Sequence, residues 1–85
     1  MVNFDTMDRS DTERILAEEL EVILGRSGIA VDAPLHEMGV DSMAFVELLV
    51  FIEKRFKVKL IESGLTQDDF YSIRSLAERI GSPQA

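Results

Sequence analysis

The stretch GVDSMAFVELL, residues 39–49, contains a turn, a helix cap and the start of an apolar helix. Gly39 permits a tight turn, and the Asp41 carboxylate can accept backbone N–H bonds as the N-cap. Ser42 then falls in the first helical turn, where unpaired amides and the positive end of the helix dipole favour an anion. The sequence therefore predicts a serine hydroxyl at a position that would stabilise a phosphoester.

The helix that starts at Ser42 should continue to Phe56 and have two apolar faces. At about 100° per residue, one face gathers the side chains that a core would bury, namely Phe45, Leu48, Leu49, Ile52 and Phe56. The face that carries Ser42 holds a second apolar group edged by carboxylates: Met43, Val46, Val50, Glu47 and Glu53. A chain of 85 residues has little material to cover every side of one helix, so we expect this face to dock a partner. The alternative is a helix buried on all sides.

Upstream of this stretch, the sequence predicts a helix and a long loop. Ser10 and Glu13 have the spacing of a capping box, apolar residues follow at helical spacing over residues 11–24, and Gly25 provides a stop. Residues 25–40 contain glycine and proline together with several apolar side chains. We therefore expect a long loop that packs against the core and leads the chain to the serine.

Downstream, the sequence predicts a linker and two more helices. Residues 57–61 alternate as in a strand, but no other segment offers a pairing partner, so an extended linker is expected. Thr66 can cap a short helix through Phe70, and Ser72 can cap a last helix. That last helix would turn four apolar side chains inward: Ile73, Leu76, Ala77 and Ile80.

The predicted architecture is one all-α domain at residues 10–81, with a flexible N-terminal tail at residues 1–9 and a C-terminal tail at residues 82–85. It has three main helices, one short helix and a long first loop. A chain of this size buries only about 60% of the surface that it exposes when unfolded. A deep, enclosed active-site pocket therefore does not fit easily.

The charge of the chain argues against some partners and favours others. Sixteen acidic residues against nine basic ones give a net charge of −7, which disfavours nucleic acid and anionic membranes. Residues 27–53 contain no Lys or Arg, and five carboxylates lie in that interval: Asp32, Glu37, Asp41, Glu47 and Glu53. We therefore expect a basic partner to approach Ser42. An acidic surface that serves only solubility is the alternative.

Cysteine is absent and histidine occurs once, so the chain has no disulfide, and no metal site is expected. The first nine residues lack the apolar core of a signal peptide. The longest uninterrupted apolar run, residues 48–52, is far too short to span a bilayer. We expect a cytoplasmic protein without a membrane partner, and nothing in the sequence demands more than a monomer.

Ser42 could serve three classes of function. As a catalytic nucleophile it would need His36 as base and Asp32 or Asp41 to orient that base. The chain has no G-x-S-x-G elbow and no obvious oxyanion hole, so we expect that it is not an enzyme. In a simple interaction module, the helix face would bind a partner and Ser42 would only lie next to the N-cap residue. Loss of its hydroxyl would then lower the stability a little and have no other effect. In the third class, Ser42 is a point of covalent attachment.

The third class is supported by a resemblance to a known family. Residues 39–43 and 46–48 closely resemble the G-x-D-S-[LM] signature, with its following helix, of acyl carrier proteins. Phe56 matches the aromatic residue that closes the second helix of that family, and residues 73–80 resemble its last helix. The resemblance covers nearly the whole chain and implies an acyl-carrier-like four-helix bundle.

By this resemblance, Ser42 would carry 4′-phosphopantetheine received from coenzyme A, and the terminal thiol of that arm would hold a carboxylic acid as a thioester. The implied partners are a phosphopantetheinyl transferase, an acyl- or aminoacyl-loading ligase, and synthase or transferase enzymes with basic docking surfaces. Asp41 would serve capping and recognition. The positions that match the docking surface of the family are Met43, Val46, Glu47, Val50 and Glu53.

Some positions depart from the commonest fatty-acid carriers. Ala44 and Phe45 replace residues that are usually polar, and residues 54–59 are basic where those carriers are acidic. Residues 65–73 look more like discrete carriers of secondary metabolism or of amino acids. The resemblance therefore implies a specialised acyl carrier of fatty-acid-like or secondary-metabolite biosynthesis, with an aminoacyl or peptidyl carrier as the alternative.

Overall fold

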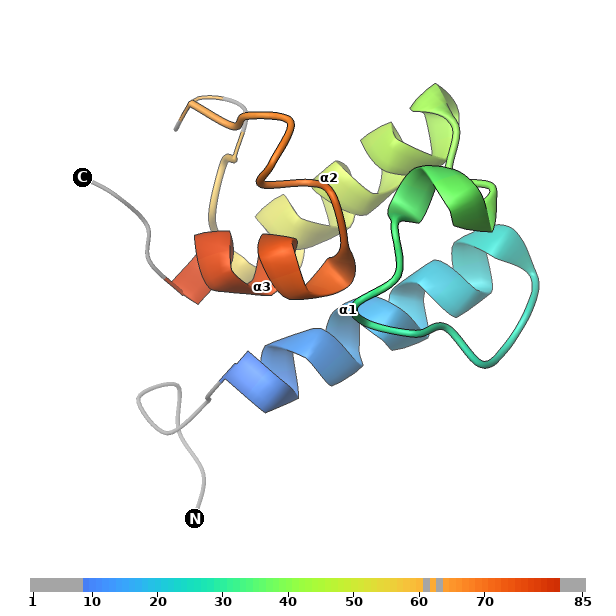
Figure 1. Ribbon diagram of the computed structural model, residues 1–85. Coiled ribbons are helices and arrows are strands. Elements are labelled where there is room, and N and C mark those ends of the chain that lie inside the picture. The colour runs from blue at the N-terminus through green and yellow to red at the C-terminus, as the bar shows by residue number, and fades with distance from the viewer. Residues whose placement is uncertain (1–8, 61, 63, 82–85) are drawn as a thin grey trace, which may run out of the picture.

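The described residues include three α-helices and a 3-10 helix of four residues, which together define the fold (Figure 1). The computed structural model describes residues 9–60, 62 and 64–81, so the predicted tails lie outside the described residues except for Arg9. The elements are α1 (Arg9–Leu24), η2 (Leu35–Met38), α2 (Ser42–Phe56) and α3 (Ile73–Gly81). Helix α1 packs against both α2 and α3, and the described residues contain no strand. The all-α prediction is confirmed.

The first helix starts two residues earlier than predicted. It begins at Arg9, so Ser10 lies inside the helix and is not its N-cap, and the predicted capping box is wrong. The Glu13 carboxylate instead lies 3.7 Å from Nε of Arg9 and 3.3 Å from Nε of Arg74 on α3. A guanidinium nitrogen of Arg9 also donates to Glu78 at 2.8 Å. Side-chain pairing with Arg9 and Arg74 thus engages the Glu13 carboxylate that the capping box would have used.

The core forms where the three helices meet. Its largest fully buried side chains come in pairs from α1, α2 and α3: Leu16, Leu20, Leu48, Ile52, Ile73 and Leu76. The stripe predicted on α2 is confirmed at Leu48 and Ile52, whereas its three other members are half-buried. The four inward side chains predicted for α3 are all buried. Because each large apolar side chain contributes about 1.5–3 kcal/mol on burial, this core fixes α2 against its neighbours.

The long first loop is packed down, as predicted. Leu35 and Met38 of η2 are buried in the core. Two backbone hydrogen bonds tie the loop to the beginning of α3 and the segment in front of it. The Leu35 N–H donates to the Tyr71 carbonyl at 2.8 Å, and the Arg74 N–H donates to the Val31 carbonyl at 2.9 Å. The loop therefore has a fixed path from α1 to α2.

The segment between α2 and α3 contains turns where a short helix was predicted. Residues 58 and 59 belong to no helix or strand and Leu60 is buried, as expected of a linker that packs on the core. Residues 67–70 form hydrogen-bonded turns and no helix. The Asp69 N–H donates to the Thr66 carbonyl, and the Asp69 carboxylate in turn accepts the Thr66 N–H at 2.9 Å. This reciprocal pair closes one turn and no helix follows it, so the predicted fourth helix is not found among the described residues.

The end of α2 has a strained cap, which gives a test of the fold. Lys57 is the C-cap at φ 62°, where its N–H donates to the Glu53 carbonyl at 2.9 Å. A side chain in this region costs roughly 1–2 kcal/mol, and glycine loses about 0.5–1 kcal/mol more entropy on folding. We therefore expect Lys57→Gly to raise the free energy of unfolding in urea by about 0.5–1 kcal/mol. Lys57→Ala keeps the Cβ atom, so an equal gain in that variant would contradict the explanation.

Candidate functional site

The chain turns sharply in front of α2. Gly39 has φ 92°, and its N–H and that of Val40 both donate to the Leu35 carbonyl. Asp41 is extended, at φ −90° and ψ −173°, and its Oδ1 accepts the Ala44 N–H at 2.9 Å. The predicted turn and the predicted N-cap are both confirmed. Together they fix the first residue of α2.

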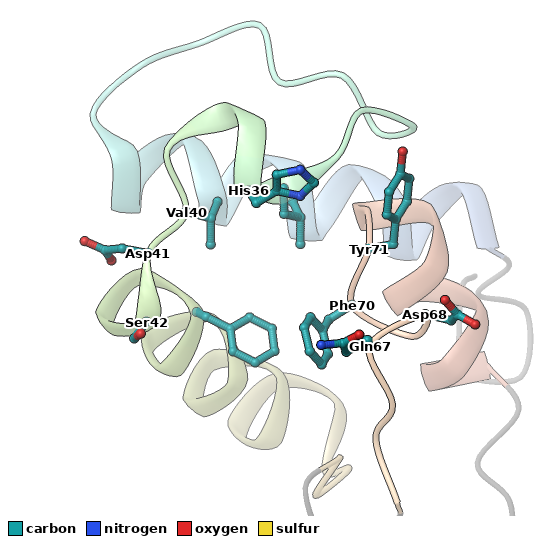
Figure 2. Close-up of a pocket in the computed structure, with 10 residues that line it drawn as sticks. His36, Val40, Asp41, Ser42, Gln67, Asp68, Phe70 and Tyr71 are labelled. Atoms are coloured by element: carbon teal, nitrogen blue, oxygen red, sulfur yellow. The ribbon is translucent and has the colours of Figure 1, made fainter.

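That first residue is Ser42, and its side chain is exposed. Figure 2 shows it on α2 at the edge of an opening between three segments. Its hydroxyl has no hydrogen-bond partner within the part of the chain that the structure describes. The first amides of a helix lack partners inside the helix and form the positive end of its dipole. The negative charge of a phosphate esterified to this hydroxyl would therefore be stabilised by the N-terminus of α2.

The face of α2 that carries Ser42 is exposed and apolar. We name it the α2 face, and it consists of Met43, Val46, Glu47, Val50 and Glu53. Its three apolar members retain 71%, 54% and 46% of their accessible surface, in chain order. These exposures show that α2 is not buried on all sides. An apolar stripe edged by two exposed carboxylates therefore lies beside the serine.

An open cleft of about 490 Å³ also lies beside Ser42 (Figure 2). Three segments form its walls: η2, the start of α2, and residues 67–71 in front of α3. The rings of Phe45 and Phe70 lie with their centroids 4.8 Å apart. The sequence does not predict the wall at residues 67–71, because no periodic pattern links these residues to Ser42. The only signal in the sequence was the aromatic pair Phe70-Tyr71 within a turn.

A catalytic Ser42 would need a hydrogen-bonded series of base and acid side chains, and His36, Asp32 and Asp41 do not form one. His36 lines the same cleft, but its Nε2 lies 3.8 Å from the carboxylate of its neighbour Glu37. The Oδ1 atom of Asp41 is taken by the helix cap, and Asp32 does not line the cleft. No hydrogen bond among the described residues joins the imidazole to the serine hydroxyl.

The N-cap gives a second test of the structure. We expect Asp41→Ala to lower the free energy of unfolding by about 0.5–2 kcal/mol, because the Ala44 N–H loses its acceptor. Asp41→Asn retains a side-chain oxygen and should lose only a small part of that amount. Urea denaturation followed by circular dichroism measures both variants. Equal losses in the two variants would show that the carboxylate charge, and not the cap, sets the stability.

Among the described helices, none combines the length and the apolar content needed to cross a bilayer. No group of three His, Asp or Glu side chains within residues 9–60, 62 and 64–81 could hold a metal ion. The candidate site thus consists of Ser42, the α2 face and the adjacent cleft.

A family model for the phosphopantetheine attachment site matches residues 13–80 of this chain. The match covers most of the sequence, and the chain belongs to this family of carrier domains. Such domains receive 4′-phosphopantetheine covalently, normally on a serine, and are generally non-catalytic. They interact with phosphopantetheinyl transferases and biosynthetic enzymes. Comparisons with curated proteins and with solved structures gave no match.

Proposed function

We propose that this chain is an acyl carrier protein and that Ser42 bears its 4′-phosphopantetheine arm. The observation that carries the proposal is the exposed Ser42 hydroxyl on the first residue of α2, within the matched residues 13–80. The turn at Gly39 and the Asp41 cap support it, because they hold this hydroxyl at the helix N-terminus.

The other described serines within residues 13–80 fit attachment less well. Ser72 is 4% exposed, and its hydroxyl caps α3 by accepting the Ser75 N–H at 3.2 Å, as predicted for the last helix. The Ser75 hydroxyl lies 3.1 Å from that of Ser72. Ser27 is exposed, but it lies in the loop after α1, where no helix begins. Ser42 combines exposure with a helix N-terminus.

The surroundings of Ser42 fit a phosphodiester. Its charge would lie beside the first amides of α2, an interaction worth on the order of 0.3–1 kcal/mol. The Asp41 carboxylate opposes that charge, but its Oδ1 is engaged by the Ala44 N–H and so contributes to the cap. The thiol at the end of the arm supplies the thioester that holds the acyl group. In this proposal the chain presents the arm and catalyses no reaction itself.

We assign the α2 face together with Asp41 as the contact surface for partner enzymes. Its apolar members supply the area that a partner can cover, and its carboxylates select a basic surface. The absence of Lys and Arg from residues 27–53 strengthens this selection. The partners in this proposal are a phosphopantetheinyl transferase, an acyl- or aminoacyl-loading ligase, and downstream synthases or transferases. Association would be fast, weak and sensitive to salt.

The cargo in this proposal is an acyl group of fatty-acid-like or secondary-metabolite biosynthesis. An aminoacyl or peptidyl carrier shares the serine and the arm, so loading assays with fatty and amino acid ligases distinguish the two. We take the chain to act as a cytoplasmic monomer that needs neither nucleic acid nor a membrane.

The first experiment is intact mass spectrometry. The apo-protein is incubated with coenzyme A, magnesium and a broad-specificity phosphopantetheinyl transferase. A gain of one phosphopantetheinyl group is the expected result. If a folded sample gains no mass while a control carrier is modified, the chain is an interaction module and the α2 face is its binding surface.

A further inference from the structure

Exposed basic residues cluster at the end of α2 that is remote from Ser42. We name this cluster the basic end, and it consists of Lys54, Arg55, Lys57 and Lys59. Among the described residues, no carboxylate forms an ion pair with any of these side chains. Each arginine of α1 and α3, in contrast, is paired with a carboxylate. The charge of the basic end is therefore available to act on a partner.

The helix dipole accounts for only part of this cluster. Cations in the last turn of a helix are favoured by its negative end, which applies to Lys54 and Arg55. That effect falls off within the last turn, and Lys59 lies three residues beyond Phe56, the end of α2. Lys59 instead lines a hollow of about 290 Å³ on the side of α2. Its charge therefore needs an explanation at this hollow.

The hollow is similar in composition to the α2 face. Its apolar lining consists of Val46, Leu49, Val50 and Leu60. The carboxylates Glu53 and Glu62 line it as well. A basic partner that recognises apolar surface beside carboxylates therefore finds both features here too. Because the hollow and the α2 face share three residues, Val46, Val50 and Glu53, the two docking positions differ by a displacement along α2.

Such a displacement of the partner would prevent attachment. Val50 lies four residues after Val46, so a partner centred on Val50 is shifted by about 6 Å along the helix axis. Reacting atoms have to approach within about 3–3.5 Å of each other. The shift therefore takes the Ser42 hydroxyl out of reach of the coenzyme, and the displaced complex is bound but unproductive.

We propose that the basic end, and Lys59 in particular, keeps basic partners from docking in this displaced position. The inference rests on the proposed contact between the α2 face and a basic partner. Like charges that face each other across an interface suppress wrong complexes and fix its register. The displaced partner meets Lys59, whereas the productive one meets Glu47 and a segment, residues 27–53, without Lys or Arg. Lys59 is thus a specificity-determining residue that acts by repulsion.

The test compares two variants of equal net charge. Lys59→Glu and Arg14→Glu each replace one cation by one anion and so change the net charge by −2, from −7 to −9. Arg14 lies on α1 and does not line the hollow. The rate of mass gain is measured at increasing concentrations of apo-protein, with a broad-specificity phosphopantetheinyl transferase and saturating coenzyme A. The salt concentration is about 0.15 M, where charges more than about 8 Å apart are largely screened.

The two kinetic constants distinguish unproductive binding from weaker binding. Unproductive binding occupies the transferase without reaction, so it lowers kcat and KM by the same factor and leaves kcat/KM unchanged. For Lys59→Glu we expect kcat and KM to fall together by about threefold, because the displaced complex loses a repulsion and gains an attraction. Arg14→Glu should have the constants of the wild type. So should Lys59→Arg, which retains the positive charge.

Three results would overturn the role of Lys59 alone. The first is an unchanged kcat and KM in Lys59→Glu, and the second is an equal fall in Arg14→Glu or in Lys59→Arg. The third is a changed kcat/KM in Lys59→Glu, which would place the lysine in the productive complex. In each case the wild type still gains its phosphopantetheinyl group, so the proposed function stands. No mass gain in the wild type overturns the proposed function and this inference together.

Discussion

Replacing Ser42 by alanine is expected to abolish attachment of the arm. The hydroxyl oxygen is the atom that would form the ester, and alanine has no atom that could replace it. The substitution should leave the fold intact, because Ser42 is exposed and its side chain makes no hydrogen bond among the described residues. Exposed substitutions of this kind usually change stability by less than about 0.5 kcal/mol. Intact mass after transferase treatment and a urea titration measure the two effects separately.

The matched control is Ser27→Ala. This serine is also exposed, and it lies with Ser42 in the tryptic peptide of residues 27–54. The control protein should gain the full mass, and fragmentation of that peptide should place the added group on Ser42. A full mass gain in the Ser42→Ala protein would move the arm to another residue and remove the main support of the proposed function.

Charge reversal on the α2 face is expected to slow attachment strongly. In the Glu47→Lys/Glu53→Lys double variant, two exposed carboxylates beside the apolar stripe become ammonium groups. Like charges across a contact cost several kcal/mol, and about 1.4 kcal/mol corresponds to a factor of ten. We therefore expect kcat/KM of the transferase for this variant to fall at least about tenfold at low salt. The loss should shrink as salt is added, because screening weakens the repulsion.

The control keeps the same change in net charge but places it on another helix. Glu18→Lys/Glu19→Lys alters two carboxylates of α1, which lie outside the α2 face. If attraction depends on the local surface, this variant should be modified nearly as fast as the wild type. Equal losses in both double variants would instead show that only the total charge of the chain matters.

Local sequence patterns predicted much of the fold. Apolar spacing predicted α2 with its observed ends, Ser42 and Phe56, and the inward side chains of α3. Gly25, at φ 70°, follows α1 as predicted. Helical angles also separated the buried stripe of α2 from the exposed face around Ser42. These features depend on side chains within one helix or turn, which a sequence displays directly.

Two features depend on contacts between distant segments and could not be predicted in this way. At the start of α1, Arg9 pairs with Glu78 and Glu13 pairs with Arg74, both of α3, and no local sequence pattern displays these contacts. The cleft exists because Phe70 and Gln67 are brought opposite the start of α2 by the path of the chain after residue 57. Thr66 was predicted to cap a helix. In the structure its N–H donates to the Asp69 carboxylate and closes a turn.

The backbone hydrogen bond from the Leu35 N–H to the Tyr71 carbonyl, at 2.8 Å, joins two walls of the cleft directly. Across the opening, the rings of Phe45 and Phe70 meet with their centroids 4.8 Å apart. Phe45 lies about one helical turn after Ser42, so the serine and one ring of this contact belong to the first turn of α2. The opening beside Ser42 is thus bounded by a backbone hydrogen bond on one side and by a ring contact on the other.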